Sequence, residues 1–540
     1  MLLHIICLVF KLYKFSNLTL VLSISKLFNK TSILNQYKTF FREKNNTLPL
    51  LETTSEYRER WISLKIMFFT TFLMSLGFSI VITGIWPYLR QLDPLATKEF
   101  MGYIVAAHPF AQMIFSPLIG WWGNWLKSSQ IPFMFTMVLF VLSSGLYSSV
   151  ELFSVNREYW MLSARFLIGA CSANIALCRS YISSATKLEE RTRAVSMISL
   201  AQVLGFIVGP GLQAAVTPLG HNGFHIWPGK LTVNMYTAAG WVNVVLGLIN
   251  LILVTPLFFK EKSIAAKEAM FLSSSPSEKA AWKQIKPDYL IAWTMIIAFF
   301  AITLIFVLLE SIGTTLAIEQ FAWTDKEALS YIGILLSCGS IAACFIAMSI
   351  DKLSKLVGEV QLLIWGSFFL VVIGSSIYIP IGGELPLIAY KNASVDDETN
   401  RVLGCPEEQE WCLYTPAIGK YQYVIGFVLI SIGYPIGITL IQTIFSKILG
   451  PRPQGVWMGL ITGFGCLSRV VGPVFVVYIY TNLGTVWTFG LISALMVFSL
   501  FWLLIFKDRI TNACLLALKL QNNDNEAKPE IELGDLEEAD

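Results

Sequence analysis

The sequence predicts an all-α membrane protein whose helices cross the bilayer many times. Of its 540 residues, 55% are hydrophobic and only 14% are charged, and the mean hydropathy is +0.62. Soluble globular domains do not have this composition. A bilayer core of about 30 Å requires about 20 apolar residues per helix, and the chain contains many such windows separated by short polar segments.

Twelve apolar windows follow one another, and a lysine-rich stretch at 260–288 divides them into two sets of six. The chain is therefore expected to fold as two six-helix halves joined by a linker. The windows are predicted to begin near Lys65, Gly102, Pro132, Tyr159, Arg193, Asn234, Tyr289, Leu329, Val360, Gly419, Gln454 and Thr485.

The same pattern predicts the domain organisation. At the N-terminus, a signal anchor and a poorly structured extension are both conceivable, and the extension is favoured because Lys11 and Lys14 interrupt the apolar runs. The expected parts are a cytosolic extension at 1–60, a first half at 61–259, a basic cytosolic linker at 260–288, a second half at 289–507 with a lumenal loop at 382–418, and an acidic cytosolic tail at 508–540.

Basic loops predict the orientation, because cytosolic loops carry the excess of lysine and arginine. The linker, the loop with Lys187 and the turn with Lys352 all fall on one side, which places both ends of the bundle in the cytosol. The loop at 382–418 falls on the opposite side. It contains the glycan acceptor Asn392-Ala-Ser394. It also holds Cys405 and Cys412, which an oxidising lumen could join.

The two halves repeat one another weakly. Gly205-Phe-Ile-Val-Gly209-Pro210 in the fifth window corresponds to Ser468-Arg-Val-Val-Gly472-Pro473 in the eleventh. Gly120-Trp-Trp-Gly-Asn124 after the second window corresponds to Ala347-Met-Ser-Ile-Asp351 after the eighth. Repeated six-helix halves are typical of transporters with a pathway between the halves.

At these residues the chain resembles the major facilitator superfamily. The loop signature of that family has a glycine, three residues, an aspartate and then basic residues. Here Asn124 stands in place of the aspartate, with Lys127 nearby, whereas the second copy keeps Asp351 and Lys352. The resemblance implies a twelve-helix transporter in which these two loops help to gate the pathway.

Longer strings are similar to a lysosomal member of the superfamily, from about Leu50 to about Lys507. That resemblance implies a multi-pass lysosomal membrane protein that handles an ion or small solute, with chloride conductance known for the type. The strings are GIWPYLRQLDP (84–94), RSYISSATKLEERT (179–192), VNMYT (233–237), WCLYTP (411–416) and SKILGPRPQGVWMG (446–459).

Four charged residues inside the windows are the candidates for a transport pathway, because charge within the bilayer is costly and usually functional. Arg165 lies about 9 Å into the fourth window and either faces a cavity or snorkels to the lumenal headgroups. Arg179 lies near the cytosolic end, where it lines the pathway or holds the loop with Glu189 and Glu190.

The other two candidates lie in the second half. Arg469 is about 15 residues into the eleventh window, too deep to reach either interface easily. Glu310 is the acidic candidate; it pairs with an arginine, shuttles a proton or sits at the lumenal mouth. Three arginines against one glutamate predict a positive cavity, which favours an anion.

Several classes of function are not indicated. The chain has no H-E-x-x-H, no phosphate-binding glycine loop, no G-x-S-x-G and no C-x-x-C pair, so we expect no enzyme, cofactor or metal site. The net charge of +3 does not suggest nucleic-acid partners.

Three functions remain open: a conductance for a small anion such as chloride, a proton-coupled alternating-access carrier of a small solute, and a non-transporting membrane scaffold. The first is preferred because a positively charged cavity favours an anion. The scaffold is disfavoured because it need not keep charges within the membrane. Membrane lipid and the anion or solute are the expected partners. Leu50-Leu51 resembles a dileucine sorting pair, which would add a sorting adaptor.

Overall fold

The computed structural model describes residues 51–514, apart from 83, 95, 221–222, 228–230, 274–275, 285 and 390–403. The N-terminal extension before Leu51, the tail after Cys514 and the glycan acceptor Asn392 therefore lie outside the described residues, as does Leu50.

Within the described residues, eleven helices are long and apolar enough to cross a membrane. The last of these runs for 51 residues, and Gly484 interrupts it with a φ of 86° that no helix contains. Because the two parts on either side of Gly484 are separate spans, the expected twelve are confirmed.

The first half consists of six spans, the fourth of which breaks into two helices at Ala173. Its elements are α4 (Thr54–Ile82), α5 (Ile85–Leu92), α6 (Lys98–Leu126), α7 (Gln130–Ser148), α8 (Arg157–Ser172), α9 (Asn174–Ser184), α10 (Leu188–Val216), the antiparallel strands β1 (Phe224–Trp227) and β2 (Leu231–Val233), and α11 (Thr237–Val254).

The linker contains two short helices, and the second half contains the remaining spans. These elements are α12 (Ile264–Leu272), α13 (Glu278–Gln284), α14 (Tyr289–Phe321), α15 (Asp325–Val357), α16 (Glu359–Gln361), a π-helical turn (Leu362–Phe368), α17 (Phe369–Ile377), the parallel strands β3 (Ile388–Ala389) and β4 (Cys405–Pro406), α18 (Lys420–Leu449) and α19 (Gly455–Ile505).

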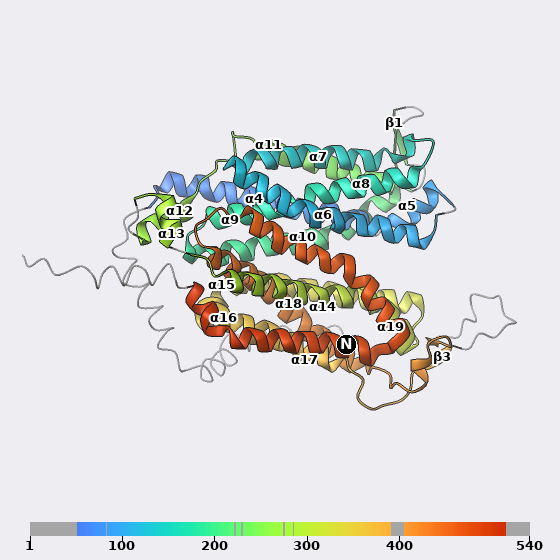
Figure 1. Cartoon of the computed structure of the whole chain (residues 1–540). Coiled ribbons are helices and arrows are strands. Elements are labelled where there is room, and N and C mark those ends of the chain that lie inside the picture. The colour runs from blue at the N-terminus through green and yellow to red at the C-terminus, as the bar shows by residue number, and fades with distance from the viewer. Residues whose placement is uncertain are drawn as a thin grey trace, which may run out of the picture.

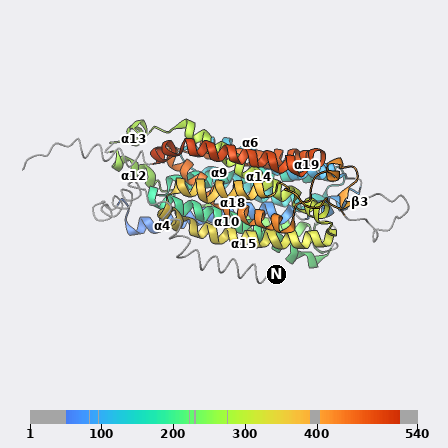
Figure 2. The same ribbon diagram turned by 90° about the horizontal axis from the view of Figure 1, so that it is seen from below.

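The two halves lie side by side with their helices roughly parallel to one long axis (Figures 1 and 2). Helices α12 and α13 lie at one end of the bundle, which we call the linker end. Strands β1 and β3 lie at the opposite end, which we call the loop end (Figure 1). Each half has its own buried apolar packing, formed by residues of that half alone. The interface between the halves is therefore the place to look for a transport site.

Helix α4 begins at Thr54, about three helical turns before the start near Lys65 that the apolar pattern predicts. The hydroxyl of Thr53 accepts a hydrogen bond from the backbone of Glu56 at 3.3 Å, and the Glu56 carboxylate accepts one from the backbone of Thr53 at 2.9 Å. This reciprocal cap satisfies free N–H groups at the helix start. Hydropathy detects only the apolar part of a helix that continues beyond the bilayer.

Small residues bring the spans of the first half together. A Cβ placed on Gly209 of α10 would lie 2.0 Å from the Ser79 Oγ of α4, and one on Gly205 would lie 2.6 Å from the Phe72 carbonyl oxygen. Glycine is therefore required where these two helices cross, as in other membrane helix pairs.

Candidate functional site

A central cavity of about 70 Å³ lies between the two halves. Its walls come from α4, α6, α8, α9 and α10 of the first half and from α14, α18 and α19 of the second. Since one water molecule needs about 10–15 Å³ of such volume, the cavity holds a few water-sized particles. In this conformation its size fits a small ion.

Two of the sequence-predicted residues, Arg179 and Arg469, line this cavity together. They come from different halves, α9 and α19. None of the residues that line the cavity in the described part of the chain is acidic. A guanidinium stays protonated in proteins, so the cavity wall is positively charged.

Arg179 bridges the halves. Its Nη1 donates to the Thr462 hydroxyl of α19 at 2.7 Å, and its Nη2 donates to the Gln202 side-chain oxygen at 3.4 Å. The expected role in holding the loop that contains Glu190 is not what the structure shows, because Glu190 pairs with Arg60 instead.

Arg469 lies against aromatic side chains rather than against an acid. Its guanidinium carbon is 5.2 Å from the centre of the Phe206 ring and 5.8 Å from that of Phe78. Such contacts stabilise a cation modestly. They leave much of its capacity to donate hydrogen bonds available to a ligand.

Arg165 does not line the cavity, although it is completely buried. Its guanidinium lies 5.5 Å from the centre of the Phe78 ring, within the first half. The snorkelling expectation is therefore wrong, because a side chain with no exposure does not reach the headgroups.

Beside Phe78 lies His108 of α6, whose ring centre is 4.7 Å from that of Phe78. The His108 Nε2 and the Ser172 hydroxyl are 3.1 Å apart, and Gln112 donates to the Ser172 carbonyl oxygen at 3.1 Å. A Cβ on Gly169 would lie 2.2 Å from the His108 carbonyl oxygen, so this glycine permits α6 and α8 to meet.

Glu310, the acidic candidate, is exposed and is not part of the cavity wall. Within the described residues, no ion pair joins it to Arg469. Among the described residues of the second half, the buried acid is instead Glu319, which the sequence analysis missed. Its carboxylate accepts from the Tyr480 hydroxyl at 2.7 Å and from the Gln409 side chain at 3.4 Å. A carboxylate so close to the end of an apolar window looks like an ordinary surface residue in the sequence.

The linker end is closed by contacts between the halves. The predicted gating residue Asn124 accepts a hydrogen bond from the Gly455 backbone, the first residue of α19, at 3.0 Å. The hydroxyls of Ser183 and Ser446 are 2.7 Å apart, and Arg191 donates to the Ser446 carbonyl oxygen at 3.4 Å.

A partly buried ion pair adds to this closure. Lys447 and Glu359 are 2.6 Å apart within the second half, and the Thr192 hydroxyl of the first half donates to the same carboxylate. The other predicted gating residues do not join the halves in this way: Asp351 pairs with Lys355 on its own helix at 3.1 Å, and Lys127 and Lys352 are exposed.

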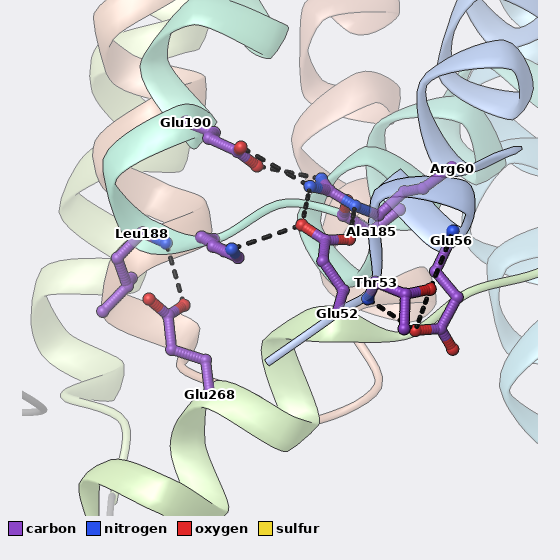
Figure 3. A network of polar contacts seen from close by, with 9 residues as sticks. Glu52, Thr53, Glu56, Arg60, Ala185, Leu188, Glu190 and Glu268 are labelled. Carbon is purple, nitrogen blue, oxygen red and sulfur yellow. Dashed lines mark hydrogen bonds and ion pairs between the residues drawn. The ribbon is translucent and has the colours of Figure 1, made fainter. Parts of the chain in front are cut away.

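The repeat in the sequence suggests that Asp351 would cap α10 as Asn124 caps α19. The structure instead uses the linker: the Leu188 backbone, at the first residue of α10, donates to Glu268 of α12 at 2.9 Å (Figure 3). A carboxylate at a helix N-terminus is favourable. Burial raises the pKa of Glu268 above its usual range, more than the Leu188 contact and nearby Arg191 lower it.

A second polar network fixes the start of α4 to the loop between α9 and α10 (Figure 3). Arg60, which is 1% exposed, pairs with Glu52 at 2.6 Å and with Glu190 at 2.9 Å, and donates to the Ala185 carbonyl oxygen at 2.8 Å. Burial raises the pKa of Glu52, but Arg60 and Lys187 outweigh it and hold the pKa below its usual range.

At the loop end, a disulfide joins Cys405 to Cys412. The indole of the intervening Trp411 packs on the break in α19, where a Cβ on Gly484 would lie 2.6 Å from the ring. The indole nitrogen donates to the Thr481 carbonyl oxygen at 3.2 Å. This loop therefore packs against the last two spans of its own half.

Comparisons with known proteins agree with this architecture. The sequence profile described as the Major Facilitator Superfamily matches residues 67–390. The Xenopus laevis protein named Major facilitator superfamily domain-containing protein 8 is 37% identical over 470 residues, which cover 84% of this chain and 92% of that protein. Multidrug resistance protein 2 of Bacillus subtilis is 25% identical over 300 residues, covering 54% of this chain and 66% of that protein.

Solved structures share the fold at low sequence identity. The human organic anion transporter MFSD10 superposes with a TM-score of 0.56 at 15% identity, over 82% of this chain and 99% of that one. The proton:xylose symporter XylE superposes with a TM-score of 0.60 at 12% identity, over 83% of this chain and 96% of that one. Proteins of this family are transporters rather than enzymes. The chain is thus a multi-pass membrane transporter that belongs to the major facilitator superfamily.

Proposed function

We propose that this transporter passes a small anion, chloride being the simplest, through the central cavity between its halves. One observation carries the proposal: Arg179 and Arg469 line the cavity from opposite halves, and no described lining residue is acidic. Rings of pore-lining arginines are an established way to select anions. The cavity volume of about 70 Å³ agrees with a small ion.

Efflux of chloride from proteoliposomes tests this proposal. With valinomycin and potassium present to balance charge, we expect Arg469→Gln to slow efflux at least about tenfold, the loss that corresponds to one charge-assisted hydrogen bond. Arg469→Lys should retain part of the flux because the charge remains. Arg193→Gln is the matched control, since Arg193 is exposed outside the cavity. Normal efflux in both Arg469→Gln and Arg179→Gln would contradict the proposal.

A proton-coupled carrier is the second candidate. It is supported by the contacts between the halves, which lie on one side of the cavity and could be exchanged for contacts on the other as the halves rock. In the same vesicles, a chloride or solute flux that stops when the proton gradient is abolished would favour the carrier. A flux that ignores the proton gradient would favour simple conductance.

We infer the location from the resemblance to a lysosomal relative. On that basis the linker end faces the cytosol and the loop end faces the lysosomal lumen, as the basic loops suggest. Glycosylation of Asn392 tests this orientation. A glycosidase should increase the electrophoretic mobility of the protein, and Asn392→Gln should abolish the change.

Leu50 and Leu51 remain a proposed sorting pair. If an adaptor binds them, alanine at both positions should divert the protein from lysosomes.

A further inference from the structure

Arg165 is a buried cation without a protein partner. The residue is 0% exposed, and its Nε, Nη1 and Nη2 atoms all lack a hydrogen-bond partner in the described structure. A guanidinium is always charged and carries five N–H donors. Burying such a group without compensation is among the most unfavourable arrangements in a protein. Something other than an ordinary side-chain contact should balance it.

The groups around Arg165 do not supply a negative charge. Its electrostatic neighbours are Tyr147 of α7 and His108 of α6, neither of which is acidic. Within the described residues, no aspartate or glutamate forms an ion pair with it. The contact with the Phe78 ring at 5.5 Å helps, but a cation–π contact does not saturate the donors.

Phe78 connects this buried arginine with the central cavity. The centre of its ring is 5.5 Å from the guanidinium carbon of Arg165 and 5.8 Å from that of Arg469. Phe78 and Arg469 line the cavity, whereas Arg165 does not. The Phe78 ring is therefore a part of the cavity wall that touches the guanidinium of Arg165.

We propose that Arg165 forms a second anion site, inside the first half, which a small monovalent anion reaches from the central cavity when the Phe78 ring turns aside. The unpartnered guanidinium nitrogens donate to the anion, whose charge balances the buried cation. The proposal rests on the proposed function in one respect, namely that an anion enters the central cavity. It adds a binding site that the cavity itself does not contain.

His108, which packs on the Phe78 ring, does not donate to the anion. The Ser172 hydroxyl already donates to the Ile168 carbonyl oxygen at 2.9 Å, so its oxygen accepts from the His108 Nε2–H at 3.1 Å. In that tautomer, the buried and unpartnered Nδ1 carries a lone pair. The donors for the anion therefore come from Arg165.

The chemistry of the site selects its ligand. A dry site favours anions that lose water easily, because burial removes the hydration shell. Bromide and thiocyanate should therefore bind more tightly than chloride. Gluconate should not reach the site, because it is too large to pass through a central cavity of about 70 Å³.

Anion-dependent thermal stability of the full-length protein tests the proposal. The protein, purified in detergent, is melted in sodium chloride or sodium bromide, with gluconate replacing the halide at constant ionic strength. A ligand that binds only the folded state raises the melting temperature with concentration. The measurement is made in a protein that carries Arg179→Gln and Arg469→Gln, so that the cavity arginines do not contribute to the halide response. In this background we expect Arg165→Gln to raise the half-maximal halide concentration at least about tenfold, as expected for the loss of a charged hydrogen bond.

The gluconate arm separates binding from a purely structural role. Without halide, Arg165→Gln should be at least as stable as the wild type, because the uncompensated charge is gone. A variant that is less stable than the wild type in gluconate, with an unchanged halide response, would overturn the proposal. Arg193→Gln, which changes an exposed arginine, should behave as the wild type does in both salts.

A second variant keeps the proposal testable if Arg165→Gln does not fold. Phe78→Leu retains Arg165 and Arg469 and replaces the ring between them with a smaller side chain. Halide should therefore stabilise this variant at a lower concentration than it does the wild type. Phe72→Leu, on the same helix but outside the cavity, should leave that concentration unchanged. If Phe78→Leu also leaves it unchanged, the proposed route through Phe78 is wrong.

These measurements also distinguish this site from the proposed function. If efflux is normal in Arg469→Gln and Arg179→Gln while the halide response is lost in Arg165→Gln, the transport proposal fails and the second site stands. If Arg165→Gln keeps the halide response while Arg469→Gln loses efflux, the second site fails and the transport proposal stands.

Discussion

The two ends of the bundle are built differently. At the linker end, polar contacts cross between the halves: Asn124 accepts from Gly455, and Ser183 meets Ser446. At the loop end, the polar contacts of the described residues stay within one half. Glu319 accepts from Tyr480 in the second half, and Gln213 donates to the Met235 carbonyl oxygen at 2.8 Å in the first.

This difference shows how the cavity is enclosed. Arg179 holds Thr462 across the cavity, and the remaining side-chain hydrogen bonds between the halves in the described structure lie toward the linker end. Each half also has its own buried apolar packing. A change in the relative position of the halves must break these polar contacts and the close backbone packing of α6 on α19, which are the targets of the following predictions.

The largest effect is expected from Gly120→Val at the linker end. A Cβ on Gly120 of α6 would lie 2.1 Å from the Gly455 carbonyl oxygen of α19, so the two backbones leave no room for a side chain. The valine should push the halves apart there. In a double variant with Ser183→Cys and Ser446→Cys, oxidative cross-linking should be efficient, and adding Gly120→Val should reduce it to background.

Gly102→Val is the matched control on the same helix, because no atom lies within 4 Å of its Cβ position. Cross-linking should be unaffected by that change. Efficient cross-linking in the presence of Gly120→Val would mean that the close approach of α6 and α19 does not hold the linker end closed.

An intermediate effect is expected from Asn124. Asn124→Ala removes the acceptor for the Gly455 N–H and should weaken the closed linker end by about 0.5–1.5 kcal/mol. Asn124→Asp should strengthen it by about 0.3–1 kcal/mol, because a negative charge then faces the N-terminus of α19. The rate of the same cross-link should fall in the first variant and rise in the second. Lys352→Ala, an exposed change, should alter neither; equal rates in all three would refute the role of Asn124.

The smallest effect is expected on the pH dependence of stability, where Glu268 of the linker contacts Leu188 of the first half. Burial raises the pKa of Glu268 in the folded protein, against the opposing effects of Leu188, Arg191 and Lys187, and nearby Glu190 adds to the increase. An acid whose pKa rises on folding binds its proton more tightly in the folded state, so stability increases as the pH falls through that pKa. Glu268→Gln should remove this dependence, as measured by melting temperature between acidic and neutral pH.

Glu52 should contribute a pH dependence of stability opposite to that of Glu268. Burial raises its pKa, but Arg60 and Lys187 lower it by more, so the stabilisation is present above its unfolded pKa and is lost as the pH falls through the folded value. Glu52→Gln should therefore destabilise the protein more at neutral than at acidic pH. If Glu52→Gln and Glu268→Gln change the pH profile in the same direction, the assigned environments are wrong.

The spans could be predicted because bilayer thickness sets a length that apolar runs must meet. The apolar pattern predicts that the twelfth span begins near Thr485, and the structure places the break between the eleventh and twelfth spans at Gly484. The start of α4 could not be predicted in this way, since a helix that leaves the bilayer is stabilised by its cap at Thr53 and by Arg60 rather than by hydropathy.

The candidate site was predicted in part. The sequence identified Arg165, Arg179 and Arg469 because charge stands out within apolar windows. It could not assign their environments: Arg179 and Arg469 share the cavity, whereas Arg165 lies out of it in contact with Phe78. Phe78 had no distinguishing signal, because one phenylalanine among many apolar residues looks like packing.

The sequence by itself determined that this protein folds in a lipid bilayer, how many times the chain crosses it, and that charged residues lie within the spans. These properties depend on composition and on local length, which a single chain reveals. Only the tertiary structure decided that Glu268, rather than Asp351, caps α10. It likewise decided that, among the described residues of the second half, Glu319 is buried while Glu310 is exposed. These outcomes depend on which helix faces rotate toward one another, and packing between distant segments sets that rotation.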